Sequence, residues 1–163
     1  CRGAMPQSLS PSAQKVQDAL LAFGLDLQVL ELPSSTRTAV EAAQAVGCDV
    51  GQIVKSLVFR GAHSGIPVLL LVSGRNRVNE QAVAGVLGEP IGKADADFVR
   101  QHTGFVIGGV PPVGHSEKLR TLIDEDLLQY DQIWAAAGTP NALFQLQAQD
   151  LLKISAGQVC KIN

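Results

Sequence analysis

The sequence predicts a single α/β domain built on a mixed β-sheet with helices around it, and three observations support this. Its 163 residues are 46% hydrophobic and 17% charged, which is enough for one sizeable core and too little for two ordinary domains. Short β-branched runs alternate with helix-like segments along the chain, but they do not repeat as strict βαβ units. No internal repeat or low-complexity linker divides the chain.

The first third of the chain predicts two helices on either side of one strand. Pro11 stands where helices commonly start, and the apolar residues after it follow the three-and-four spacing of a helix face. Gly24 and Gly47 follow the two periodic segments and are typical helix stops. The predicted elements are a helix from Pro11 to Phe23, a strand from Leu25 to Leu32 and a helix from Thr38 to Val46.

The middle of the chain predicts a hairpin of buried strands followed by two helices. The two strands are short, largely β-branched apolar runs joined by a turn with two glycines, and Asn79 can cap the helix that comes after them. The predicted elements are strands at Ile53 to Phe59 and Ile66 to Val72, and helices at Asn79 to Leu87 and Asp95 to His102.

The last third predicts mostly strands. A strand that begins at Gly104 is expected to run into a Gly/Pro-rich loop at Gly108 to His115. Three more strands and one short helix should follow, at Leu119 to Ile123, Gln132 to Ala136, Ala142 to Leu146 and Gln147 to Leu152.

Charge is distributed unevenly, although the net charge is only −2. The segment from Ile53 to Arg120 holds eight basic and five acidic residues, whereas residues 121–150 hold five acidic residues and no Lys or Arg. This balance, and the absence of a helix-turn-helix pattern, argue against a DNA-binding protein. No apolar stretch approaches the roughly 20 residues of a membrane-spanning helix, so we expect no membrane partner.

The three cysteines are widely spaced and form neither a C-x-x-C pair nor a disulfide framework, which favours a reducing, cytoplasmic location. Met5 is the single methionine and looks like the native start. We therefore expect residues 1–4 to be a cloning remnant and residues 5–163 to form the domain.

Conventional catalytic motifs are missing from the sequence. There is no nucleophile elbow and no phosphate-binding glycine loop, and Cys48 and Cys160 have no neighbours that would lower a thiol pKa. The three histidines lie far apart without a second ligand at helical spacing, so no metal site and no cofactor are expected.

Two other features point to chemistry. Lys55 lies inside the apolar run Ile53 to Phe59, and strand alternation puts it on the face of Leu57 and Phe59, where an ammonium needs an anion, carbonyls or a wet pocket. The alternative is a lysine that reaches bulk water. In the loop Gly108 to His115, paired glycines permit close approach to a ligand and paired prolines stiffen the backbone. The alternative is a rigid turn without a ligand.

Together, a pocket lysine and rigid backbone donors can bind a carbonyl or carboxylate and stabilise an oxyanion without a protein nucleophile. Hydrolysis of an acyl ester by a positioned water would suit such a site.

Three motifs in this order resemble the YbaK/ProX-type aminoacyl-tRNA deacylases, relatives of the editing domain inserted in bacterial prolyl-tRNA synthetases. The motifs are Ile53 to Phe59, Gly108 to His115 and Ala136 to Phe144, preceded by the helix with Glu41-Ala42-Ala43. The resemblance covers about Ser12 to Ile162. It implies a curved, barrel-like mixed sheet surrounded by helices.

The resemblance also implies an activity. This is hydrolysis in trans of the ester of a mischarged tRNA, typically tRNA-Pro, with the substrate's own terminal hydroxyl helping the water. Lys55 would hold the substrate end, and the backbone amides of the Gly108-Pro112 loop would surround the ester. Small amino acids such as Ala, Cys, Ser or Thr are the expected substrates, and prolyl-tRNA synthetase is an expected partner.

By this resemblance, the catalytic candidates are Lys55, Gly108 and Gly109. The expected substrate-binding residues are Thr36, Ser73, Val110, Pro111, His115, Gly138 and Asn141. One departure concerns the strand after the Ala-Gly motif, where some members carry an acidic residue and this chain has Ala142-Leu143-Phe144. A pocket for a small apolar or uncharged side chain is therefore expected. The alternative function is a module that binds an amino acid or a synthetase without hydrolysis.

Overall fold

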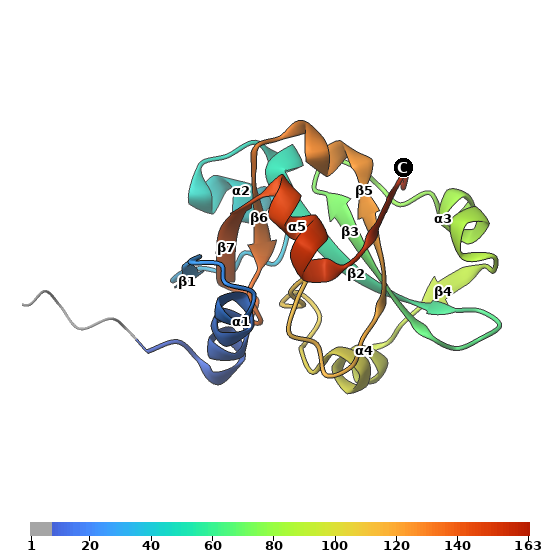
Figure 1. Ribbon diagram of the computed structural model, residues 1–163, viewed down its shortest axis with the longest axis horizontal. Coiled ribbons are helices and arrows are strands. Elements are labelled where there is room, and N and C mark those ends of the chain that lie inside the picture. Colours follow the sequence, from blue (N-terminus) through green and yellow to red (C-terminus); the bar gives the residue numbers. More distant parts are fainter. Residues whose placement is uncertain (1–7) are drawn as a thin grey trace, which may run out of the picture.

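The structure is a computed structural model that describes residues 8–163, and its strands form one mixed sheet flanked by helices (Figure 1). The cloning remnant expected at residues 1–4 and the start expected at Met5 lie outside the described residues. The helices are α1 (Pro11–Ala22), α2 (Ala39–Val46), α3 (Glu80–Leu87), α4 (Ala96–Thr103), α5 (Ala148–Ser155), and the 3-10 turns η1 (Val50–Gln52) and η2 (Glu125–Gln129). The strands are β1 (Val29–Glu31), β2 (Ile53–Gly61), β3 (Pro67–Ser73), β4 (Ile91–Lys93), β5 (Arg120–Asp124), β6 (Gln132–Ala136), β7 (Ala142–Gln147) and β8 (Gln158–Cys160).

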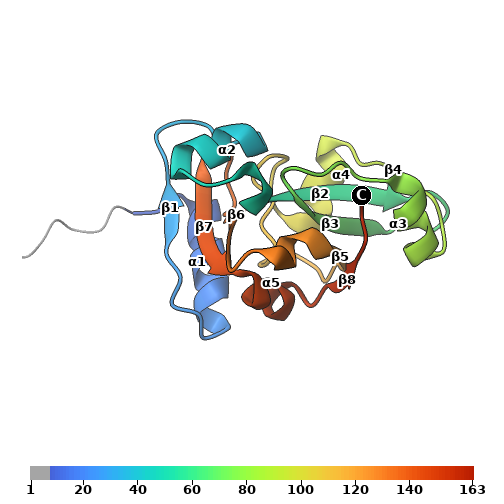
Figure 2. The ribbon, with the colours of Figure 1, turned by 90° about the horizontal axis from the view of Figure 1, so that it is seen from above.

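The sheet runs in the order β1-β7-β6-β2-β3-β5-β8, and β4 pairs with β2 off this path. Strands β2 and β6, β3 and β5, and β5 and β8 pair in parallel, whereas the other pairs are antiparallel. The sheet is therefore mixed, as the sequence predicts, but its path does not close into a barrel. Helices α1 and α3 lie at opposite ends of the molecule (Figure 2).

Strand β2 is the centre of the sheet and has a gap along one edge. It pairs with β3 from Val54 to Arg60. On its other edge, β6 pairs only with Ile53 and Val54, and β4 pairs only with residues 59–61. Among the described residues, the edge of β2 over residues 55–58 has no strand partner. An unpaired strand edge leaves backbone donors and acceptors available to a ligand.

The two faces of the β2–β3 hairpin pack into different cores. One face belongs to the main core, with Leu69 and Leu71 of β3 together with buried residues of α1, α4 and α5. The other face belongs to a smaller core, with Val68, Leu70 and Val72 of β3 and Val83 of α3. A strand buried on both faces requires a nearly continuous apolar sequence, which explains why this hairpin is the clearest strand signal in the chain.

Most predicted elements are confirmed, and their boundary residues explain why. Thr38 caps α2 in a reciprocal capping box with Glu41, and Gly47 ends it in the left-handed conformation at φ 74°. Asn79 and Asp95 likewise accept backbone N–H bonds at the starts of α3 and α4. These signals are local, so they can be recognised in the sequence.

Two predicted strands are wrong in extent or existence. The segment Leu25 to Leu32 forms a strand only at Val29–Glu31. The strand expected from Gly104 is absent, because Thr103 turns the chain by accepting the backbone N–H of Phe105 while its hydroxyl also donates to Val99. The short strands β4 and β8 had not been predicted as strands. None of the helices within residues 8–163 is both long enough and apolar enough to cross a membrane.

Candidate functional site

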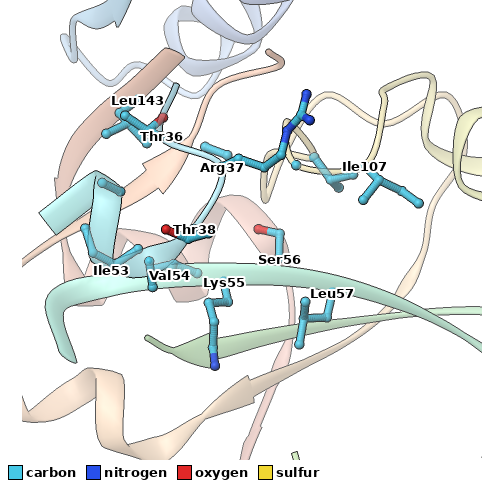
Figure 3. Close-up of a pocket in the computed structure, with 15 residues that line it drawn as sticks. Thr36, Arg37, Thr38, Ile53, Val54, Lys55, Ser56, Leu57, Ile107 and Leu143 are labelled. Atoms are coloured by element: carbon cyan, nitrogen blue, oxygen red, sulfur yellow. The ribbon is translucent and has the colours of Figure 1, made fainter. Parts of the chain in front are cut away.

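A cavity of about 340 Å³ opens at the gap along the edge of β2 (Figure 3). Its walls come from the segment before α2, the first half of β2, the loop after α4, and the strands β6 and β7. The lining residues are Thr36, Arg37, Thr38, Ala39, Ala42, Ile53, Val54, Lys55, Ser56, Leu57, Ile107, Gly108, Val110, Ala136 and Leu143. The cavity is thus mostly apolar with a few polar groups, as is common for sites that bind small molecules.

The segment Thr36 to Thr38 forms one wall of the cavity. The backbone N–H and the hydroxyl of Thr36 both donate to the carbonyl oxygen of Pro140, at 2.8 and 3.0 Å. Thr36 is buried, whereas Arg37 is exposed and its side chain lies beside the loop that contains Gly108. This anchoring fixes the predicted site residue Thr36 in the wall and leaves the Arg37 guanidinium at the rim.

The opposite wall is the Gly108-Pro112 loop, and only part of its backbone is available to a ligand. The N–H of Gly109 donates to the carbonyl oxygen of Val106 at 3.0 Å, so the expectation of free amides is wrong for Gly109. The N–H groups of Gly108 and Val110 have no acceptor among the described residues. Because proline has no N–H, these two groups are the donors that this stretch can offer.

Gly109 and Gly138 do not line the cavity, but they hold the loop in place behind it. The N–H of Gly138 donates to the carbonyl oxygen of Gly109 at 2.8 Å. A Cβ at Gly109 would lie 2.8 Å from the Cα of Thr139, and Gly138 has φ 100° with no room for a Cβ beside Ser12. Both glycines therefore serve close backbone packing.

Lys55 lines the cavity, yet its ammonium points to the other side of β2. In Figure 3, its side chain extends away from Arg37 and Ser56, and Nζ donates to the carbonyl oxygen of Asn76. Burial is the main cause that lowers the pKa of Lys55, with Arg77 adding to it and Asp124 opposing it. The carbonyl partner meets the need of an ammonium beside apolar side chains, one of the environments expected from the sequence.

Ser56, the next residue, faces the cavity side of β2. Its Cα partner in β3 is Leu71 of the main core, whereas Lys55 is opposite Val72 of the smaller core. The Ser56 hydroxyl is buried and has no hydrogen-bond partner among the described residues. Buried hydroxyls are nearly always paired, so an unpaired one beside a cavity marks a position where a ligand can bind.

The remaining predicted site residues lie outside the cavity lining. The hydroxyl of Ser73 donates to the carbonyl oxygen of Gly51, and Ser73 is not among the residues that line the cavity. The side chain of Asn141 donates to Leu32 and accepts from Thr139, so it stabilises the β6–β7 turn. Pro111 is buried in the loop and uses its carbonyl oxygen as the partner of His115.

His115 lies on the far side of the loop, in a separate hollow. Its Nε2 is 2.6 Å from the carbonyl oxygen of Pro111, so Nε2 carries the proton that is donated. Burial lowers the pKa of His115, and the Lys15 cation lowers it further, against the opposing effect of the Pro111 bond. A neutral His115 thus stabilises the loop from behind.

A second cavity of about 210 Å³ adjoins the first. It shares Ser56, Leu57, Ile107, Gly108 and Val110 with the first, and its other walls are apolar. Ser56, Gly108 and Val110 therefore lie where the two cavities meet.

Sequence reasoning missed Ser56, Arg37 and Ile107 as lining residues. A signal for Ser56 was present, because alternation along β2 puts the residue after Lys55 on the opposite face, where a polar side chain stands among apolar ones. Arg37 and Ile107 are in loops, where no periodic pattern predicts which way a side chain points.

Comparisons with known proteins find relatives among tRNA-editing proteins. A solved structure described as a candidate trans-editing enzyme for prolyl-tRNA synthetase is 54% identical, covers 96% of this chain and 99% of its own, and superimposes with a TM-score of 0.90. EbsC of Enterococcus faecalis, named as a candidate Cys-tRNA(Pro)/Cys-tRNA(Cys) deacylase, is 26% identical over 77% of each chain. A proline–tRNA ligase of Limosilactobacillus fermentum is 35% identical over 55% of this chain and 16% of its own.

The family model described as "Aminoacyl-tRNA editing domain" matches residues 33–154. The match includes α2, the hairpin β2–β3, the cavity loop and the strands β6 and β7, which together supply the cavity walls. The chain belongs to the aminoacyl-tRNA editing domain family.

Proposed function

We propose that the protein is a trans-editing deacylase, which hydrolyses the ester between a small amino acid and a mischarged tRNA. Ala, Cys, Ser and Thr are the proposed amino acids and tRNA-Pro the proposed carrier, and the proposed compartment is the cytoplasm, where tRNA is used. The observation that carries this proposal is the apolar cavity at the open edge of β2, in a chain of the editing family.

The size and lining of the cavity support a small uncharged amino acid. Its volume of about 340 Å³ is at the low end for ligand sites, and no carboxylate lines it. Leu143 lines the cavity from the strand in which some family members carry an acidic residue, so a cationic side chain would find no partner there. The relatives named for Cys-tRNA(Pro) and prolyl-tRNA synthetase support tRNA-Pro as the carrier.

The reaction requires a water and an oxyanion site. The water oxygen adds to the ester carbonyl carbon, the carbonyl oxygen becomes negatively charged, and the bond to the ribose oxygen then breaks. One water proton ends on the ribose oxygen, and the other leaves with the free amino acid's carboxyl group. The N–H groups of Gly108 and Val110 are the proposed donors to the oxyanion.

Water activation is assigned to the substrate. Among residues 8–163, no carboxylate, histidine or cysteine lines the cavity, so its walls offer no ordinary general base. The neighbouring ribose hydroxyl of the terminal nucleotide lies next to the ester in any bound pose, and it can relay the proton. This assignment agrees with the absence of a nucleophile motif in the sequence.

Lys55 is the proposed cation of the site. To reach the substrate, its ammonium must leave the carbonyl oxygen of Asn76, which the flexible four-carbon stem permits. There the ammonium can meet the negative charge that develops in the transition state. Gly109, Pro111, Gly138, Asn141 and His115 are proposed to act through the loop and the turn rather than by contact with the substrate. Ser73 is proposed to act through its hydrogen bond to the carbonyl oxygen of Gly51.

The experiment is deacylation of tRNA-Pro charged with Ala, Ser, Thr or Cys by the purified full chain. We expect hydrolysis of at least one ester, and a loss of about 10²-fold in rate for Lys55→Ala, the usual effect of removing one transition-state partner. Lys153→Ala, an exposed lysine in the last turn of α5, is the matched control and should keep full activity. A wild type that leaves every ester intact but shows a thermal shift with free amino acids would replace this proposal with a binding module.

A further inference from the structure

We infer that the hydroxyl of Ser56 donates the third hydrogen bond to the oxygen of the scissile carbonyl, beside the N–H groups of Gly108 and Val110. The inference rests on the proposed function. It adds a side-chain hydroxyl to the two backbone donors and to the Lys55 cation already proposed for the site. The observation behind it is the buried Ser56 hydroxyl without a partner, at the junction of the two cavities.

The position of Ser56 follows from the strand. Lys55 and Ser56 face opposite sides of β2, and Figure 3 shows Ser56 on the side of Arg37 and Thr38. Residues 55–58 have no strand partner on the gap edge, so the substrate can approach this stretch without displacing secondary structure. Ser56 is therefore held by the pairing of β2 with β3, and it lines both cavities beside the gap.

An unpaired buried hydroxyl lowers the stability of the free protein, because it has lost its hydrogen bonds to water. Rotation about the single Cα–Cβ bond can direct Oγ toward either cavity. Gly108 and Val110 line the same cavities, and their unpaired N–H groups present hydrogens with a partial positive charge, which a developing oxyanion can accept. Three donors around one oxygen form a complete oxyanion site.

Ser56 is not assigned as a nucleophile. A serine that attacks an ester needs a base within hydrogen-bond reach, and its hydroxyl has no partner of any kind among the described residues. The residues that line the second cavity include no titratable side chain. The hydroxyl can therefore donate its own proton in a hydrogen bond, but nothing in the wall can remove that proton.

The test compares Ser56→Ala, Ser56→Thr and Ser155→Ala in the full chain. Ser155 is the matched control, since its hydroxyl donates to Leu151 and accepts from Gly157 on α5, away from the cavity. We expect Ser56→Ala to lower kcat for the mischarged tRNA by about 10²-fold with KM nearly unchanged. Its melting temperature should be unchanged or higher, because the hydroxyl that it removes has no partner.

Ser155→Ala should show the reverse pattern, a lower melting temperature with full activity. Ser56→Thr keeps the hydroxyl and should retain far more activity than Ser56→Ala. If the wild type is active and Ser56→Ala keeps its kcat, or only KM rises, the assignment of Ser56 to the oxyanion is overturned while the deacylase proposal stands. A wild type inactive on every ester overturns the deacylase proposal and this inference together.

Discussion

Gly138 donates its backbone N–H to the carbonyl oxygen of Gly109 at 2.8 Å, and this contact joins the β6–β7 turn to the cavity loop. The two segments lie so close that a Cβ at Gly109 would be 2.8 Å from the Cα of Thr139. On its other side, the turn touches the start of α1, where a Cβ at Gly138 would be 2.6 Å from the carbonyl oxygen of Ser12. The position of Gly108 and Val110 in the cavity wall therefore depends on residues that do not line the cavity.

Gly138→Ala should destabilise the protein and slow deacylation at the same time. The backbone at φ 100° is unfavourable for alanine, and the added Cβ meets the backbone of Ser12. We expect the free energy of unfolding, measured by urea denaturation, to fall by about 1–3 kcal/mol or more.

The control for this change is Gly85→Ala in the exposed part of α3, where a Cβ meets nothing within 4 Å. Alanine is the better helix former, so this variant should gain about 0.5–1 kcal/mol and keep its activity. Equal stability of the two variants would mean that the turn can move away from Ser12 and accommodate the added Cβ without a cost in stability.

His115 makes the stability of the loop dependent on pH. Its pKa in the folded protein lies below the ordinary value of 6.5, chiefly because of burial. The unfolded chain therefore binds the proton more readily, and stability decreases as the pH falls through 6.5 until the lowered pKa of the folded state is passed. Above pH 6.5 the residue is neutral in both the folded and the unfolded state, so it does not make the free energy of unfolding depend on pH.

Urea denaturation of the wild type and of His115→Gln, from pH 8 down to about pH 5, measures this contribution. Glutamine cannot take up a proton in this range and can still donate to the carbonyl oxygen of Pro111. We expect the two stability curves to run parallel above pH 6.5 and to diverge below it, with the wild type falling faster. Curves that stay parallel over the whole range would show that burial of His115 does not disfavour its charged form.

The sequence predicts the fold well where the signal is local. Caps such as Thr38 with Glu41 and stops such as Gly47 depend on neighbours in the chain, and those helices begin and end as expected. The segment after Thr103 could not be predicted in the same way. Its apolar residues suggest a strand, yet Thr103 turns the chain by accepting the backbone N–H of Phe105. The loop that follows is held by the N–H of Gly138 on the carbonyl oxygen of Gly109, and this partner is distant in sequence.

The candidate site was predicted in its location but not in its details. The sequence points to the segment around Lys55 and to the Gly/Pro loop, and both line the cavity. It cannot show that β6 leaves β2 after Val54 and that β4 pairs only from Phe59 on, because this gap is a property of strand register. The role proposed for the unpaired hydroxyl of Ser56 depends on this gap, because the gap lets a ligand approach that part of β2.

Ala136 sets the width of the cavity from the side of β6. It is half-buried in the wall and pairs with Leu143 of β7. Ala136→Val should narrow the cavity with little loss of stability, since valine suits a strand. If the wild type hydrolyses both the threonyl and the alanyl ester of the tRNA, we expect the kcat/KM for the larger threonyl ester to fall about 10-fold relative to that for the alanyl ester.

Ala135→Val tests whether this effect is specific to the cavity. Ala135 is fully buried in the main core, so the added methyl groups should cost about 1–3 kcal/mol of stability. The ratio of the two kcat/KM values should stay as in the wild type. A ratio that changes equally in both variants would place Ala136 outside the amino-acid pocket.

Arg37 is expected to bind a phosphate near the end of the tRNA. Its side chain lies along the loop at the cavity rim, within 3.1 Å of where a Cβ of Gly108 would be, and it is exposed. Among residues 8–163, no carboxylate forms an ion pair with it. Arg37→Ala should raise the KM for mischarged tRNA several-fold and reduce the salt slope of binding by about 1.

Arg37→Lys keeps the charge and should retain most of the salt slope, although it loses the two-pronged geometry of the guanidinium. Arg120→Ala, which removes an exposed arginine that donates to Gln158 on the edge of the sheet, is the control for net charge and should leave the KM unchanged. An aminoacyl adenosine without phosphate separates binding from chemistry, because Arg37→Ala should hydrolyse it as fast as the wild type. If the variant is slow on this small ester too, Arg37 acts on the cavity itself and not on the tRNA backbone.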